Sequence, residues 1–155
     1  MQRYSFLDLQ AFASAIYNGR QLLMVPYAYN VTVLALAQNG VSNQSLSITA
    51  NADFILTGMK YRAQIGAAQT VSNKTAAFVR VLITDSGSNE QFTNAAVDLE
   101  NYSTNGGDSR DLPFPRFIQG RTALTMQFTN YAPTAETYTS IDFMLEGVLV
   151  RAVSG

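Results

Sequence analysis

Residues 44–59 read QSLSITANADFILTGM, and apolar and polar side chains alternate along them almost without interruption. The apolar set occupies the even positions, namely Leu46, Ile48, Ala50, Ala52, Phe54 and Leu56. A repeat of two places successive side chains on opposite faces of an extended strand, whereas a helix would scatter them around its axis. We interpret the stretch as one long strand with one buried face, with a break near Ala50 and Asn51 as the alternative. Gly58 is expected to mark a bulge or a close backbone approach.

The same alternation returns in three further segments, at residues 77–84, 122–129 and 138–150. Residues 31–37 read VTVLALA and are apolar on both faces apart from Thr32, which predicts a strand covered on both sides. Shorter strands are expected near residues 59–64 and 91–97.

Turn-forming residues separate these segments. The linkers are DSGSN at 85–89, NGGDS at 105–109 and YAPT at 131–134. Glycine, asparagine and proline at such positions favour tight turns between antiparallel strands. No long helical period interrupts the series, so the pattern predicts an all-β antiparallel sandwich or barrel over residues 29–155.

The N-terminal segment, residues 1–28, has a different pattern. Ser5 followed by Asp8 loosely matches a helix capping box, and the pair Asn18 and Gly19 would end the helix. The apolar residues between them fall at spacings of three and four: Phe6, Leu9, Phe12, Ala13 and Ile16. Two interpretations remain open, a short helix packed on the chain's own sheet and an arm that docks on a neighbouring subunit.

Composition excludes several kinds of chemistry. Cysteine and histidine are both absent, so disulfides, thiolate nucleophiles, the usual zinc sites and imidazole catalysis are excluded. We therefore expect a protein that is not an enzyme, with no catalytic residue, no metal and no cofactor. The net charge of −1 predicts no nucleic-acid partner. No apolar run of membrane-spanning length is present, and the start lacks the features of a signal peptide, so we expect synthesis in a cytosol and no membrane partner.

Four acidic residues gather in one predicted loop, at Asp98, Glu100, Asp108 and Asp111. Oxygen ligands in such a loop can hold calcium, and a pair of carboxylates can drive glycoside hydrolysis. The spacing matches no EF-hand loop, so a solvated loop is the favoured interpretation.

Two further features are candidate contact sites. Residues 112–116 read LPFPR, and we interpret them as a corner where a strand begins, rather than as a polyproline ligand, with Leu112, Phe114 and Phe117 plugging the end of a sandwich. Tyr27 and Tyr29 share a strand face beside Pro26. The candidate interface residues are Phe6, Leu9, Phe12, Ile16, Tyr27, Tyr29, Arg116 and Arg121.

The order of four tracts resembles a known family. ADFILTG (52–58), FVRVLITDSGS (78–88), LPFPRFIQGRTALTMQFTN (112–130) and YTSIDFMLEGVLVR (138–151) are similar, in this order, to small virion proteins of tailed bacteriophages, of the decoration or cement type. The resemblance covers about residues 44–151 and leaves out the N-terminal 40 residues.

The resemblance implies a jelly roll that binds the outside of an assembled capsid. It implies two partners, the major capsid protein and further copies of the chain in a trimer or dimer. The expected location is the virion, after synthesis in the cytoplasm of a bacterial host. Three alternatives stay open: a tail, collar or fibre-base module, a carbohydrate- or receptor-binding β-sandwich with an exposed aromatic strip, and a carboxylate-driven hydrolase.

Overall fold

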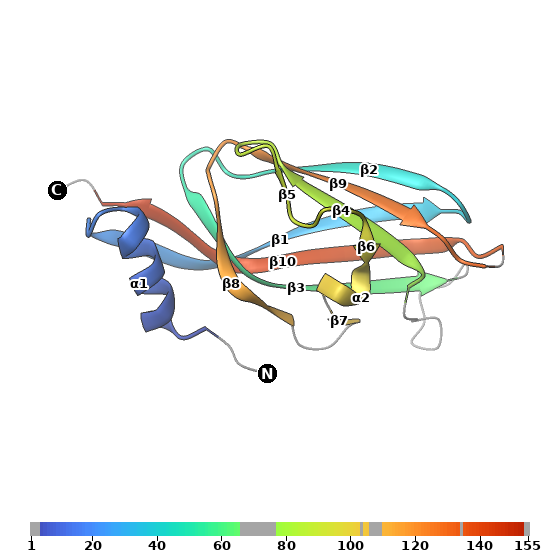
Figure 1. Cartoon of the computed structure of the whole chain (residues 1–155), viewed down its shortest axis with the longest axis horizontal. Coiled ribbons are helices and arrows are strands. Elements are labelled where there is room, and N and C mark those ends of the chain that lie inside the picture. Colours follow the sequence, from blue (N-terminus) through green and yellow to red (C-terminus); the bar gives the residue numbers. More distant parts are fainter. Residues whose placement is uncertain (1–3, 66–76, 103, 106–109, 134, 154–155) are drawn as a thin grey trace.

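The computed structural model describes residues 4–65, 77–102, 104–105, 110–133 and 135–153. They form two β-sheets packed face to face, with a helix at one end (Figure 1). The elements in chain order are α1 (Phe6–Ile16), β1 (Leu22–Leu36), β2 (Val41–Ser47), β3 (Asp53–Ile65), β4 (Val79–Asp85), β5 (Glu90–Gln91), β6 (Val97–Asp98), α2 (Leu99–Tyr102), β7 (Thr104–Asn105), β8 (Arg110–Ile118), β9 (Ala123–Asn130) and β10 (Tyr138–Ala152).

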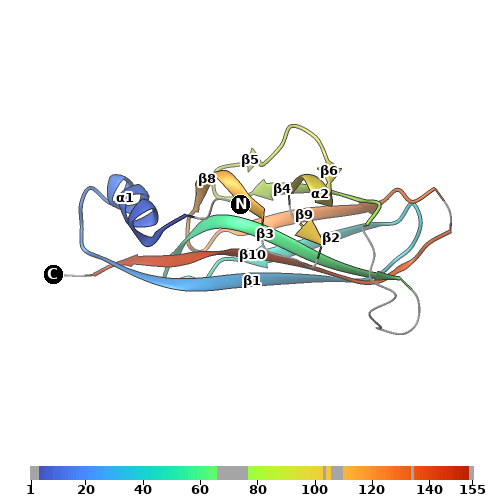
Figure 2. The ribbon, with the colours of Figure 1, turned by 90° about the horizontal axis from the view of Figure 1, so that it is seen from below.

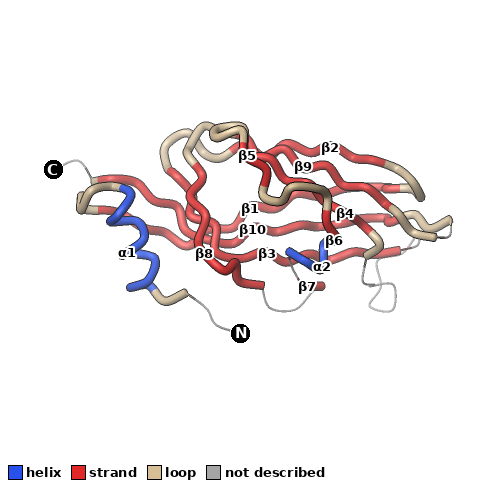
Figure 3. Tube along the Cα trace, in the orientation of Figure 1, coloured by secondary structure: helices blue, strands red, loops and turns tan. Residues whose placement is uncertain are grey.

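The strand order is that of a jelly roll. Sheet A has the order β1-β10-β3, with β8 and β7 both pairing with β3, and sheet B has the order β2-β9-β4, with β5 and β6 both pairing with β4. Thus β1 pairs with β10, β2 with β9, β3 with β8, and β4 with β5 and β6. This nested pairing is that of a long hairpin folded into two layers. Strands dominate the described chain (Figure 3), and apart from the short β3–β7 pair every pairing is antiparallel. The predicted antiparallel sandwich is confirmed.

Alternating side chains fill the space between the two sheets. Along β4 every second residue is buried, and the same holds for β9 and for β10 from Ile141 to Leu145. Phe128 of sheet B meets Phe143 of sheet A edge to face, with 6.0 Å between ring centroids. Burial of one face of each strand is the main stabilising contribution, at about 25 cal/mol per Å² of apolar area. The strands predicted at 77–84, 122–129 and 138–150 are therefore confirmed.

Residues 44–59 do not form one strand. The chain turns at Ala50 and Asn51, so β2 belongs to sheet B and β3 to sheet A. The predicted continuous strand is wrong and its alternative, the break, is right. The same face stays buried across the turn because Ile48 and Ala52 both lie in the core.

The strand at residues 31–37 is not covered on both sides. It belongs to β1, which forms one edge of sheet A and pairs only with β10. Val31 and Val33 are buried, but Leu34 is 69% exposed. An alternation of apolar residues with other apolar residues gives no periodic signal, so the sequence pattern could not identify the outer face. β1 also begins at Leu22, so the predicted boundary between residues 28 and 29 falls inside a strand.

A bulge beside Gly58 changes which side chains of β3 face the core. Gly58 pairs with Glu146 and Leu56 with Gly147, so Thr57 has no partner on β10. The Thr57 hydroxyl donates instead to the Glu146 carbonyl, at 3.1 Å. Gly147 packs so closely against β3 that an added Cβ would lie 1.9 Å from the Ile55 carbonyl oxygen. The bulge predicted at Gly58 is confirmed.

Helix α1 covers the outer face of sheet A. Ser5 accepts a hydrogen bond from the Asp8 N–H and donates its own N–H to the Asp8 carboxylate, which confirms the capping box. Asn18 and Gly19 follow the helix with positive φ values of 56° and 76°, as expected where a helix ends. Among the described residues, no helix has the length and apolar character needed to cross a membrane.

The sequence LPFPR lies within the edge strand β8 and not at a corner before a strand. Asp111, just before it, pairs with Gly58, and its last residue, Arg116, pairs with Leu56, so residues 112–115 bulge out of the ladder. Proline is tolerated here because an edge strand needs fewer backbone donors. Leu112 packs on the core, but Phe114 is 81% exposed, so the prediction that Phe114 plugs the sandwich is wrong.

Buried tyrosines bind the backbone of the loops. Three of their hydroxyl groups accept from backbone amides at 2.8–3.3 Å: Tyr29 from Thr49, Tyr61 from Ala77 and Tyr138 from Phe78. Tyr61 also donates to the Glu100 carboxylate, which ties α2 to β3. Each ring fills the core while its hydroxyl satisfies a donor that would otherwise be buried without a partner.

We expect Gly147→Ala to destabilise the protein by more than about 2 kcal/mol, because the new methyl group would collide with the backbone of β3. Urea unfolding followed by circular dichroism measures the change. Ser47→Ala, at an exposed position of β2, is the control and should stay within about 0.5 kcal/mol of the parent. A Gly147→Ala variant as stable as the control would contradict the tight approach.

We expect stability to fall above about pH 10, where tyrosines of the unfolded chain ionise. Burial, and then Glu100, raises the pKa of Tyr61 in the folded state, and burial, and then Asp53, raises the pKa of Tyr17. The stabilisation is therefore complete below the unfolded pKa and is lost as the pH rises above it. Urea midpoints measured from about pH 8 to about pH 12 should decline. The decline should be shallower in Tyr61→Phe, and constant midpoints across this range would refute the coupling.

Candidate interaction surfaces

The helix α1 packs on sheet A through part of its apolar stripe and leaves other apolar side chains exposed. Leu9 and Ala13 are buried against Ile55 and Val150 of sheet A, and Phe12 is half-buried in the same cluster. Phe6 and Ile16 share this stripe but lie in the first and last turns of the helix, and they are 64% and 37% exposed. Leu7 lies on the other side of the helix and is 72% exposed. The helix therefore packs on the chain's own sheet. Its outward side chains remain free to contact another molecule.

A second apolar surface lies where sheet A extends past sheet B. The start of β1 and the end of β10 run beyond β2 and β9 towards α1 (Figures 1 and 2). Leu23, Val25 and Tyr27 of β1 share the face that farther along fills the core, yet they are 48%, 40% and 46% exposed. We call these three residues the overhang surface. No strand of sheet B covers it, because β2 ends before it reaches this part of sheet A.

The two tyrosines predicted as a contact pair have different positions. Tyr27 lies on the overhang surface, and its ring packs edge to face on Tyr29 with 4.9 Å between centroids. Tyr29 is buried and packs on Phe54, also at 4.9 Å. Only Tyr27 is accessible, and Tyr29 supports it from below.

The two predicted arginines make contacts within the chain. The Arg116 guanidinium lies 3.3 Å from the Glu90 carboxylate and 4.2 Å from the centre of the Phe92 ring. Arg121 is exposed, has a positive φ of 67° and donates to the Ala50 carbonyl at 3.3 Å. Both side chains tie β8 and the following turn to neighbouring loops.

The structure describes the side chains of two of the four residues of the predicted acidic cluster, and each has a partner within the chain. Asp98 lies 3.8 Å from Arg80, and Glu100 accepts from Tyr61. Asp108 and the side chain of Asp111 lie outside the described residues. Within the described ranges, no group of three or more acidic side chains could hold a metal ion.

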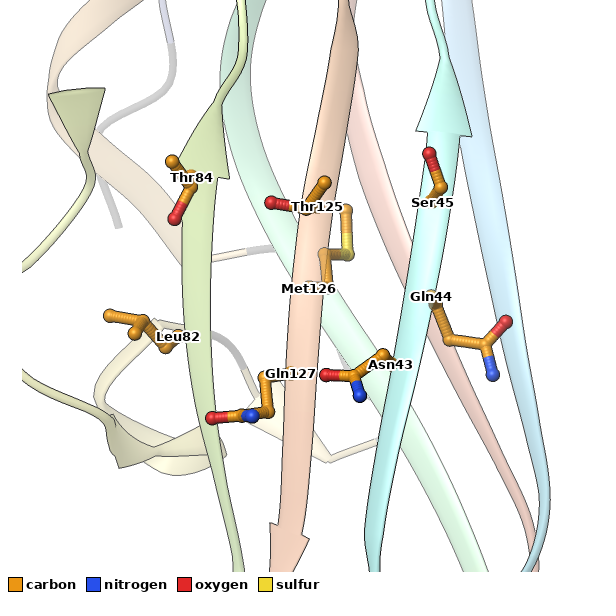
Figure 4. Close-up of a pocket in the computed structure, with 8 residues that line it drawn as sticks. All are labelled: Asn43, Gln44, Ser45, Leu82, Thr84, Thr125, Met126 and Gln127. Atoms are coloured by element: carbon orange, nitrogen blue, oxygen red, sulfur yellow. The ribbon is translucent and has the colours of Figure 1, made fainter. Parts of the chain in front are cut away.

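A hollow lies on the outer face of sheet B (Figure 4). Most of the residues that line it are polar, but more of its exposed surface is apolar. Its volume is about 360 Å³, and its central strand β9 contributes Thr125 and Gln127. Two rows cross the three strands. The first row joins Asn43, Gln127 and Leu82, and the second joins Ser45, Thr125 and Thr84. We call these six residues the sheet B platform.

The platform continues into an aromatic end. Phe78 precedes β4 and is 44% exposed, and its ring packs edge to face on Tyr131 with 5.8 Å between centroids. The Arg80 guanidinium lies 4.4 Å from the centre of the Tyr131 ring. Burial, and then the Asp98 carboxylate, raises the pKa of Tyr131 to about 12, so its hydroxyl stays neutral at physiological pH.

The sequence reasoning did not identify this platform as a site. It did predict a polar face for residues 122–129 and 44–59. It could not show that these segments lie beside β4, because strand neighbours in a jelly roll are far apart along the chain. A polar outer face on a single strand is common and does not indicate a site. Three such strands side by side form a continuous surface that a ligand could contact.

A scan against models of protein families finds no match for this chain, and a search of curated proteins finds none either.

We expect Leu9→Ala to lower the free energy of unfolding by about 2–3 kcal/mol, because it leaves a cavity between α1 and sheet A. Phe6→Ala, at an exposed position in the first turn of the same helix, is the matched control and should change stability by less than about 0.5 kcal/mol. Thermal and urea unfolding measure both. Equal effects of the two substitutions would contradict the burial of Leu9 between α1 and sheet A.

Proposed function

We propose that the chain is a structural virion protein of a tailed bacteriophage, one that binds the outside of the capsid as an oligomer and stabilises it. The proposal rests on the resemblance of the four tracts and on one observation about the surface. Apolar side chains are exposed on both sides of the same end of the molecule, on α1 and on the overhang surface.

Exposed apolar side chains concentrated at one end favour a protein that functions by contact. Contiguous apolar patches on a folded chain commonly mark sites where another protein binds. Phe6 and Leu7 are exposed on α1, which packs on one face of sheet A, while Leu23, Val25 and Tyr27 lie on its other face. Two separate surfaces allow the end of one subunit to touch two neighbours. Such a subunit can bridge a copy of itself and a capsid protein.

The mechanism is mass action. A ligand that binds only the assembled shell stabilises that shell by an amount set by its free concentration relative to its Kd. An oligomer that engages several capsid sites at once gains avidity of about 10²–10⁴ over a single contact. Weak individual contacts then suffice, and no chemical step is needed.

A particle-binding experiment tests the proposal. Purified chain is mixed with capsids assembled without it, and bound chain is measured after sedimentation. We expect saturable binding at a fixed number of sites per particle and a higher temperature of capsid disruption. Electron microscopy of labelled chain on particles separates a head location from a tail, collar or fibre-base location.

Substitutions on the two apolar surfaces give the sharper result. Leu23→Ser with Tyr27→Ser, and separately Phe6→Ser with Leu7→Ser, should reduce binding or self-association at least about tenfold, since each removes apolar contact area. Val41→Ser is the control, because Val41 is similarly exposed on β2 of sheet B. A chain that binds no virion component, or variants that all bind like the control, would remove the proposal.

A further inference from the structure

The sheet B platform contains polar side chains that the protein itself does not use. In the part of the chain that the structure describes, the side chains of Asn43, Ser45, Thr84, Thr125 and Gln127 hydrogen-bond to no other protein group. Amides offer donors and an acceptor, and hydroxyls offer both roles in one group. The face therefore presents donors and acceptors to a ligand in two regular rows.

The spacing of the rows suits an extended ligand. Neighbouring strands lie about 4.8 Å apart, and side chains on one face recur about every 6.6 Å along a strand. From Phe78 to Thr84 along β4 is six residues, or about 20 Å at about 3.3 Å per residue. A chain of several sugar units has that length, while a single sugar would cover only part of it.

The charge of the platform selects among ligands. None of the six platform side chains is ionisable, and Arg80, farther along β4, lies 3.8 Å from Asp98. Phosphate or sulfate groups would need unpaired cations, which the platform does not offer. A neutral ligand rich in hydroxyl groups matches both the charge and the hydrogen-bonding capacity.

The aromatic end supplies the apolar contact that a sugar requires. A hexose has an apolar face of C–H groups, and such a face packs on an aromatic ring. Phe78 offers an exposed ring at the end of the platform, held in place by Tyr131. Binding sites commonly combine an aromatic contact with a few polar groups that fix orientation.

We propose that the outer face of β2, β9 and β4 binds a neutral polysaccharide, with sugar hydroxyls on Asn43, Gln127 and Thr125 and one sugar ring against Phe78. The overhang surface and the exposed apolar residues of α1 lie elsewhere on the molecule, so this activity does not depend on capsid binding. A chain bound to a particle through its apolar end would keep this face available to a polysaccharide.

Affinity electrophoresis of the isolated chain tests the proposal. The probes are dextran, mannan and galactan, together with a purified neutral O-polysaccharide, and heparin is the anionic comparison. We expect at least one neutral polysaccharide to retard the chain in a saturable manner, and heparin to have no such effect. No retardation by any neutral probe, or preferential binding of heparin, would overturn the proposal.

Matched variants locate the site. Gln127→Ala and Phe78→Ala should each weaken retardation about tenfold, which corresponds to one lost polar or stacking contact. The controls are Gln119→Ala and Phe114→Ala, which remove the same side-chain types at exposed positions on or next to β8. Thermal unfolding verifies that each variant is folded. Equal retardation of platform and control variants would place the ligand elsewhere and overturn the assignment.

Discussion

The register of β10 is the constraint on which the rest of the structure depends. β10 lies between β1 and β3 and pairs with both along most of its length. Because side chains alternate between faces, a slip of one residue would expose the core face and bury the polar one. The bulge at Thr57, opposite Gly147, absorbs one extra residue of β3 without such a slip. Sheet A can therefore bury Phe54 against sheet B and Ile55 against α1.

Strand length then decides which surfaces remain uncovered. β1 and β10 each contain 15 residues, but β2 and β9 contain 7 and 8, so sheet A continues where sheet B has ended. Residues with the same parity as the core, such as Val25, become surface in this region. Sheet B has the opposite character, since its outer face carries amides and hydroxyls. Apolar contact and polar contact are thereby separated on one small chain.

Much of the fold could be predicted because it depends on local alternation. Patterns among neighbouring residues were enough to predict three strands, the capping box at Ser5 and the bulge at Gly58. The three strands are at 77–84, 122–129 and 138–150. The predictions failed where the outcome depended on distant partners. The two halves of residues 44–59 joined different sheets, Leu34 lay at an open edge, and Phe114 bulged away from the core. None of these results can be obtained from the residues next to them.

The sequence by itself determined that the chain is an antiparallel β-sandwich with a short N-terminal helix, because a period of two and a capped period of three to four are local properties. It also determined that cysteine and histidine chemistry is absent. Only the tertiary structure decided which polar faces lie side by side and which apolar residues stay exposed. The physical reason is that burial depends on the element that packs against a side chain, and in a jelly roll that element comes from a distant part of the chain.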